Sequence, residues 1–190
     1  MERTFEPDYR LTVEEYHALT DEAPDDERWE LIEGEPVLNA APSRRHQTIV
    51  QNVIVELGNR RREIGEPWIV IPGIGVRHPD DSLNEPAPDV AILPPTTDDT
   101  EHWTHDILVA FEVLSPWSLR RDMVTNRNFY TRLAPLTHYV VLAQDAMRAH
   151  VFAREADFEG RELTRADATI AFADIDTTLR LGDVYRDVSV

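Results

Sequence analysis

Two carboxylates stand at positions where burial makes a negative charge costly. Asp89 opens the apolar run of residues 90–93, and Glu112 lies inside the strand-like stretch 107–114, "ILVAFEVL". If the two stretches are neighbours in a sheet, their carboxylates converge near one end of it. Facing carboxylates repel each other, so the pair needs a bound proton or a cation. A hard divalent ion between Asp89 and Glu112 is the economical solution, since Mg²⁺ commonly uses one or two carboxylates plus phosphate oxygens, and such an ion activates water and neutralises charge on a phosphodiester.

Further polar side chains are candidates for the same site. Glu30 lies within a predicted hairpin strand and offers a third carboxylate, and His46 lies on the apolar face of a predicted helix. Asp122, Asn126 and Tyr130 follow one another at spacings of four residues, which puts them in one polar stripe along a second predicted helix.

Each candidate also has a purely structural interpretation. Asp89 follows a proline, and acids that open strands are common turn residues. Glu112 is harder to explain without a partner, although an arginine would serve. His46 alone is typical of a hydrogen-bonded core histidine, and Glu30 alone fits the exposed side of a hairpin.

Composition limits the class of protein. The 190 residues carry a net charge of −17 and contain no cysteine, which excludes disulfides and thiolate chemistry. This acidity argues against charge-driven binding to nucleic acid, but it leaves room for a local basic groove or an acidic metal site. All 19 basic residues are arginine, so the chain has no lysine. No apolar run is long enough to span a bilayer, and residues 1–10 lack a signal-peptide core, so we expect a cytoplasmic protein.

The elements that must position these side chains follow an α/β order. A mixed β-sheet flanked by helices, preceded by an N-terminal helix and a β-hairpin, in a single domain over residues 1–190, accounts for this order. The expected helices are residues 11–19 (with a Thr12–Glu15 capping box), 43–65 and 118–133, and the expected hairpin is 28–41, turning at Glu33 and Gly34. The other expected strands are 68–78 (bulged), 90–93 (opened by Asp89), 107–114, 138–143 and 148–155.

The combined motifs resemble the Uma-type restriction endonuclease family, in the PD-(D/E)XK nuclease superfamily. The resemblance runs from about residue 12 to the last strand and implies a restriction-endonuclease-like fold, Mg²⁺-dependent hydrolysis of DNA, and a homodimer. It assigns Asp89 and Glu112 to the two acidic motifs, Glu30 to the acid before the sheet, and His46, Asp122 and Tyr130 to the site's border. The motifs are "WELIEGE", His46, "PDVAIL", "FEVLSP", Asp122, Tyr130 and "HYVVLA".

One position departs from the family pattern. The family's lysine lies four residues after an aspartate and four before a tyrosine, and Asn126 occupies that place here. Asparagine donates hydrogen bonds but carries no charge. The neighbouring Arg120, Arg121 and Arg127 bring charge, but arginine is a poor proton carrier near neutral pH. The sequence therefore leaves two main alternatives: an endonuclease with Asn126 in its catalytic set and slowed cleavage, or an inactive nuclease-fold scaffold or binding protein. A third, minor alternative is a structural module whose buried acids pair with arginines.

Overall fold

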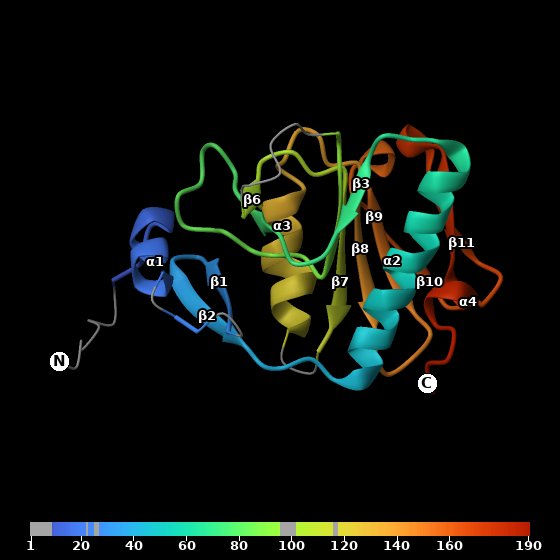
Figure 1. The fold of residues 1–190 in the computed structure, drawn as a ribbon, viewed down its shortest axis with the longest axis horizontal. Helices are drawn as coiled ribbons and strands as arrows, with labels where there is room; N and C mark the ends of the chain where they lie inside the picture. The colour runs from blue at the N-terminus through green and yellow to red at the C-terminus, as the bar shows by residue number, and fades with distance from the viewer. Residues whose placement is uncertain (1–8, 22, 25–26, 96–101, 116–117) are drawn as a thin grey trace.

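A six-stranded mixed sheet lies at the centre of the molecule (Figure 1). The computed structural model describes residues 9–21, 23–24, 27–95, 102–115 and 118–190. Within this six-stranded sheet only the strands Val109–Leu114 and His138–Ala143 pair in parallel, and the other neighbouring strands are antiparallel. The strand order is β10 (Gly160–Leu163), β9 (Ala149–Ala153), β8 (His138–Ala143), β7 (Val109–Leu114), β5 (Val90–Leu93) and β3 (Ile69–Ile71).

The two strands that carry the acids are direct neighbours. Ala91 of β5 lies opposite Ala110 of β7, and Val90 lies opposite Phe111. Both strands are almost entirely buried because helices cover the two faces of the sheet. Continued by one residue, this antiparallel register places Asp89, which precedes β5, opposite Glu112 of β7.

The long helix α2 (Arg44–Ile64) covers one face. Its apolar residues Ile49, Val53 and Leu57 are fully buried against the β7 side chains that point to this face of the sheet. The Ser43 side chain caps the helix by accepting a hydrogen bond from the His46 backbone N–H, and Gly65 ends it in the left-handed region at φ +73°. The predicted helix at 43–65 is confirmed.

The opposite face is covered by a shorter helical segment. It begins as the π-helix η1 (Arg121–Asn126) and continues as α3 (Arg127–Tyr130). Phe129 and Tyr130 pack there with Ala110 of β7. Because side chains alternate along a strand, Glu112 points to the same face as Ala110, towards this segment. The helical segment ends at Tyr130, before the predicted limit of residue 133.

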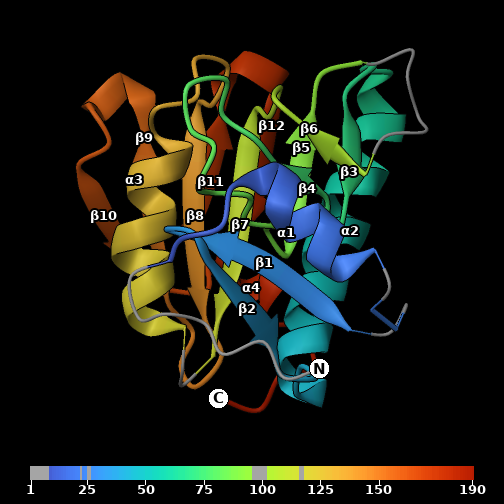
Figure 2. The same cartoon turned by 90° about the vertical axis from the view of Figure 1, so that its left-hand side faces the viewer.

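The N-terminal elements form a separate layer in front of the sheet (Figure 2). The helix α1 (Val13–Thr20) has the predicted capping box, and β1 (Arg28–Ile32) pairs with β2 (Glu35–Asn39) as the predicted hairpin. Gly34 turns the hairpin at φ +80°, where an added Cβ would lie 2.5 Å from the Cβ of Arg10. A small apolar cluster with Leu31 joins α1 to β1.

The remaining elements are short, and one prediction among them is wrong. The expected bulged strand over 68–78 is instead two strands in different sheets, β3 and β4 (Gly75–Val76), since Pro72 and Gly73, at φ +62°, turn the chain between them. The other short elements are β6 (Trp103–Thr104), β11 (Thr169–Phe172), β12 (Thr177–Arg180), α4 (Leu181–Val184) and the 3₁₀ turns η2 (Arg154–Ala156) and η3 (Ala173–Ile175).

The predicted architecture, a mixed sheet flanked by helices with an N-terminal helix and hairpin, is confirmed. Within the described ranges no helix combines the length and the apolar character that crossing a bilayer requires. The expectation about a signal peptide concerns residues 1–10, of which residues 1–8 lie outside the described ranges, as does Pro116 of the "FEVLSP" motif.

Candidate functional site

A cavity of about 840 Å³ lies between the hairpin and the sheet, and besides the exposed Glu27 four buried or half-buried acids line it. Each acid comes from a different element: β1, the residue before β5, β7 and η1. The hairpin closes one side of the cavity, and the N-terminal end of α2 closes another. The four acids are Glu30, Asp89, Glu112 and Asp122.

Asp89 is held on both of its carboxylate oxygens. The His46 Nε2–H donates to Oδ1 over 3.0 Å, and the Val113 backbone N–H donates to Oδ2 over 2.7 Å. His46 is 8% exposed and lies in the first turn of α2, so the capped start of that helix fixes its ring beside the cavity. The contact with Val113 ties Asp89 to the residue that follows Glu112.

Glu112 is buried at the back of the cavity with weak hydrogen bonds. Its Oε1 lies 3.3 Å from Asn126 Nδ2 and 3.4 Å from the Tyr130 hydroxyl. Burial is the main cause that raises the pKa of the Glu112 carboxyl well above its usual range, and the charges of Asp122 and Asp89 raise it further. Without a cation nearby, this environment favours a protonated Glu112.

Asp122 lies in η1 beside the only arginine that is placed among the four acids in the described part of the chain. Burial raises the pKa of Asp122 to about 6, against the lowering effects of a hydrogen bond from Ser118 and of the Arg121 charge. Arg121 Nε lies 3.4 Å from Asp122 Oδ1, and Arg121 Nη1 lies 3.2 Å from Glu30 Oε2. The guanidinium therefore bridges an acid of the hairpin and an acid of η1.

Glu30 retains one oxygen without a directional partner. Its Oε1 accepts a hydrogen bond of 3.0 Å from the Ala87 backbone N–H. Its buried Oε2 lies within ion-pair distance of Arg121 but receives no hydrogen bond of acceptable angle from the described residues. The ion pair still holds this oxygen, because charge attraction at this distance needs no alignment. The second oxygen of Glu30 thus keeps capacity for another donor or cation.

The seven predicted residues fall into two groups. Five of them line the cavity: Glu30, His46, Asp89, Glu112 and Asp122. Asn126 and Tyr130 are 1% and 0% exposed and contact Glu112 from behind the cavity wall. The two groups meet at Glu112, so the polar stripe of η1 and α3 supports an acid of the cavity. The turn of η1 is π-helical, a conformation that recurs at functional sites.

Sequence reasoning underestimated Arg121 and did not identify Asn39. From the sequence, Arg121 is one of three arginines near Asn126, with nothing to distinguish it from the other two. In the structure its Nη1 donates to Asn39 Oδ1 over 2.9 Å and so fastens η1 to the end of β2. Its position next to Asp122 was the available signal. No local pattern in the sequence distinguishes Asn39, which becomes part of the cavity only through the path of the hairpin.

The donor set of the cavity fits a hard divalent cation. The described residues contain no cluster of three His, Cys, Asp or Glu side chains with metal-binding geometry. Mg²⁺ keeps several waters and takes only one or two protein carboxylates, so Asp89 and Glu112 match its requirement without a third protein ligand. The buried Glu112 is also a group whose charged form a cation would stabilise.

Comparisons with known proteins agree with this fold. A family model described as "Uma2: Putative restriction endonuclease" matches residues 13–179. The solved structure of a "putative nuclease belonging to DUF820" from Anabaena variabilis ATCC 29413 superposes with a TM-score of 0.75 at 13% sequence identity, covering 94% of this chain and 99% of the other. The search of curated proteins gave no match. At this identity the structural likeness shows the fold alone.

Proposed function

Because the chain belongs to the family described as "Uma2: Putative restriction endonuclease", as its motifs indicate, we propose that it is a metal-dependent endonuclease. The family supports a nuclease-like function, and the finer proposal is hydrolysis of DNA phosphodiester bonds in the cavity behind the hairpin. In this proposal Asp89 and Glu112 hold Mg²⁺ or Mn²⁺, and Glu30 assists them.

The observation that carries this proposal is the convergence of four acids in one cavity. They come from positions between 30 and 122 in the sequence and from four separate elements. Packing alone does not favour such an arrangement, because buried like charges raise the free energy of the folded state. A bound divalent cation offsets part of this negative charge, so a metal site accounts for acids that packing alone does not favour.

The chain's own residues have distinct parts in this reaction. Asp89 and Glu112 would hold the cation, which when bound would supply positive charge near the phosphate and lower the pKa of a water. The His46 ring orients the Asp89 carboxylate, and Asn126 and Tyr130 orient Glu112. In the hydrolysis the water gives up one proton to solvent as its oxygen bonds to phosphorus, the bond from phosphorus to the leaving sugar oxygen breaks, and that oxygen takes up a proton from solvent.

A catalytically impaired scaffold is the second candidate, and one observation favours it. Asn126 occupies the place of the family's lysine, and its side chain contacts both Glu112 and Asp122 in this structure. An amide there brings no positive charge to the transition state. The fold and the acids are present in both candidates, so only activity and metal binding distinguish them.

The test combines plasmid nicking with calorimetric titration of Mg²⁺ and Mn²⁺. Wild-type protein is expected to bind the cation and to nick the plasmid, and Asp89→Ala is expected to abolish both. Asp167→Ala is the matched control, since it removes the same charge from an exposed position paired with Arg165. Metal binding without nicking by the wild type would favour the scaffold. Asp89→Ala that binds metal as tightly as wild type would contradict the metal assignment.

A homodimer is part of the proposal, because cutting both strands of a duplex requires two sites of this kind. Light scattering at micromolar protein, with and without a short duplex, measures the mass. A mass near 44 kDa, about twice the 21.8 kDa of one chain, is expected. A monomer under both conditions would contradict this assembly, and then only single-strand nicks would be expected.

A further inference from the structure

Two arginines line the acidic cavity, and one of them lies among the acids. Arg28 stands at the exposed start of β1, whereas Arg121 projects from η1 between Glu30 and Asp122. We propose that Arg121 is the residue that binds the substrate's phosphate and supplies the positive charge that a lysine supplies elsewhere in the family. This inference rests on the proposed nuclease function.

The Asp122 carboxylate lies between Arg121 and Asn126, the residue that occupies the place of the family's lysine. Asp122 Oδ1 lies 3.3 Å from Asn126 Nδ2 and 3.4 Å from Arg121 Nε. The two side chains therefore approach the same oxygen from neighbouring positions. Arg121 lines the cavity, whereas Asn126 lies behind its wall, so of the two side chains the guanidinium is the one that an entering phosphate can contact.

Arg121 also has donor groups to spare. A guanidinium carries five N–H groups, and Arg121 uses Nε and Nη1 towards Asp122, Asn39 and Glu30. Its Nη2 donates no hydrogen bond to any of the residues that the structure describes. The side chain is 23% exposed, so solvent reaches it through the cavity. Two N–H groups on one nitrogen, at the wall of an open cavity, suit a phosphate oxygen.

The charges of the cavity leave this arginine in the charged form. An arginine is protonated at any pH at which proteins are studied, and it binds phosphate through two parallel N–H groups. Glu30 and Asp122 lie beside it, so without this guanidinium an entering phosphate would face carboxylates on this side of the cavity. The carboxylates hold the guanidinium in position when the cavity has no substrate.

The competing interpretation is that Arg121 only fastens the hairpin to η1. Its contacts with Glu30 and Asn39 do join these elements. The two interpretations differ in the salt dependence of DNA binding. Each phosphate neutralised by a cationic side chain contributes about 0.9 to the slope of log affinity against log salt concentration. A purely structural arginine contributes nothing to this slope.

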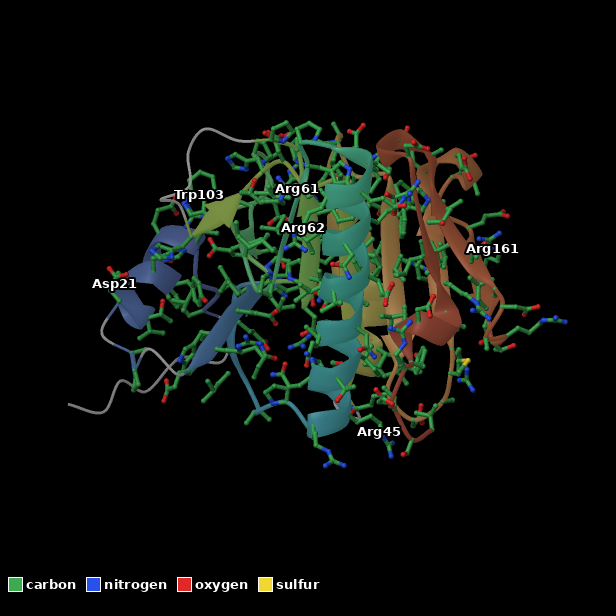
Figure 3. All side chains as sticks on the ribbon, turned by 45° about the vertical axis from the view of Figure 1, so that its right-hand side comes forward. Asp21, Arg45, Arg61, Arg62, Trp103 and Arg161 are labelled. Carbon is green, nitrogen blue, oxygen red and sulfur yellow. The ribbon has the colours of Figure 1, made fainter. Side chains whose placement is uncertain are left out.

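The experiment measures binding of a fluorescent DNA duplex over a series of NaCl concentrations in Ca²⁺, together with plasmid nicking in Mg²⁺. Arg121→Gln is expected to reduce the salt slope by about 0.9 and the nicking rate by about 10²–10³-fold. Arg121→Lys is expected to keep the slope. The matched control is Arg161→Gln, which removes one arginine charge from β10, at the edge of the sheet away from the hairpin (Figure 3). It is expected to keep both the slope and the rate.

Each other result has a defined meaning. An Arg121→Gln variant with the wild-type slope overturns the inference, even if its melting temperature falls. If that variant does not fold, the Glu30→Gln variant is compared with the Glu30→Gln, Arg121→Gln double variant. The double variant leaves no unpaired buried acid at residue 30. Equal salt slopes for these two variants would also overturn the inference. A wild type that neither binds nor nicks DNA contradicts the proposed function itself, and the inference with it.

Discussion

Asp122→Asn tests the electrostatics of the cavity through stability instead of activity. Asp122 is 2% exposed, and burial raises its pKa from the ordinary 3.8 to about 6. Its folded-state pKa is thus above its unfolded value, so folding binds a proton between about pH 4 and pH 6. This contribution is fully present below pH 4 and is lost as the pH rises through 6. The metal-free wild type should therefore become less stable over this range.

The magnitude follows from the pKa. A shift of about two units corresponds to about 3 kcal/mol, because one unit is 1.36 kcal/mol. Asparagine removes this pH-dependent term, but it gives up a hydrogen bond that the carboxylate accepts from Arg121 or Ser118, which costs about 1 kcal/mol. Relative to wild type, we expect Asp122→Asn to be less stable by about 1 kcal/mol at pH 4 and more stable by about 2 kcal/mol at pH 8.

Urea unfolding with a chelator present, at intervals between pH 4 and pH 8, measures this crossing. Thermal unfolding should show the same change of sign, with a gain of roughly 4–8 °C at pH 8 for a domain of this size. The remaining slope of the variant should also be shallower, because the Asp122 charge contributes to the raised pKa of Glu112. Parallel stability curves for wild type and variant would refute the reasoning, since they would mean that Asp122 titrates alike in the folded and unfolded chains.

Four further predictions concern single positions. Asn126→Lys should raise the plasmid-nicking rate by about 10²-fold, because it adds a preorganised charge beside the acids, and an unchanged rate would contradict this. Ser43→Ala should lower the free energy of unfolding by about 1 kcal/mol in urea, through loss of the α2 cap, and an unchanged midpoint would argue against that cap. Gly34→Ala should destabilise by more than 1 kcal/mol, since φ is +80° and the new Cβ meets Arg10, whereas Gly58→Ala, with open space in α2, should stabilise by roughly 0.5–1 kcal/mol.

Local patterns in the sequence were enough to predict several elements. The helix at 43–65 carries its own start and stop signals in Ser43 and Gly65, and the hairpin carries its turn at Glu33 and Gly34. Such signals act between residues a few positions apart, so they hold whatever the rest of the chain does. The unusual position of Glu112 was also visible, because a carboxylate in an apolar run is conspicuous without any knowledge of its neighbours.

The strand at 68–78 shows where local reasoning fails. Its residues have the composition of one bulged strand, but Pro72 and Gly73 divide it between two sheets. The choice depends on the partners available at each half: β5 for Ile69–Ile71, and β6 for Gly75–Val76. Pro72 and Gly73 allow the division locally, but the partner of each half is a segment far away along the chain, which a short window of the sequence does not show.

The sequence by itself determined the chemistry that the cavity holds: which acids interrupt apolar runs, that no lysine is present, and that the motifs belong to a nuclease family. Only the tertiary structure decided how those groups meet. The order of strands placed Glu112 on the strand next to that of Asp89 and in contact with Asn126 and Tyr130. The path of the hairpin brought Glu30 within 3.2 Å of Arg121. The physical reason is that burial and charge act through space, so the pKa of a carboxyl depends on groups that lie far away along the chain.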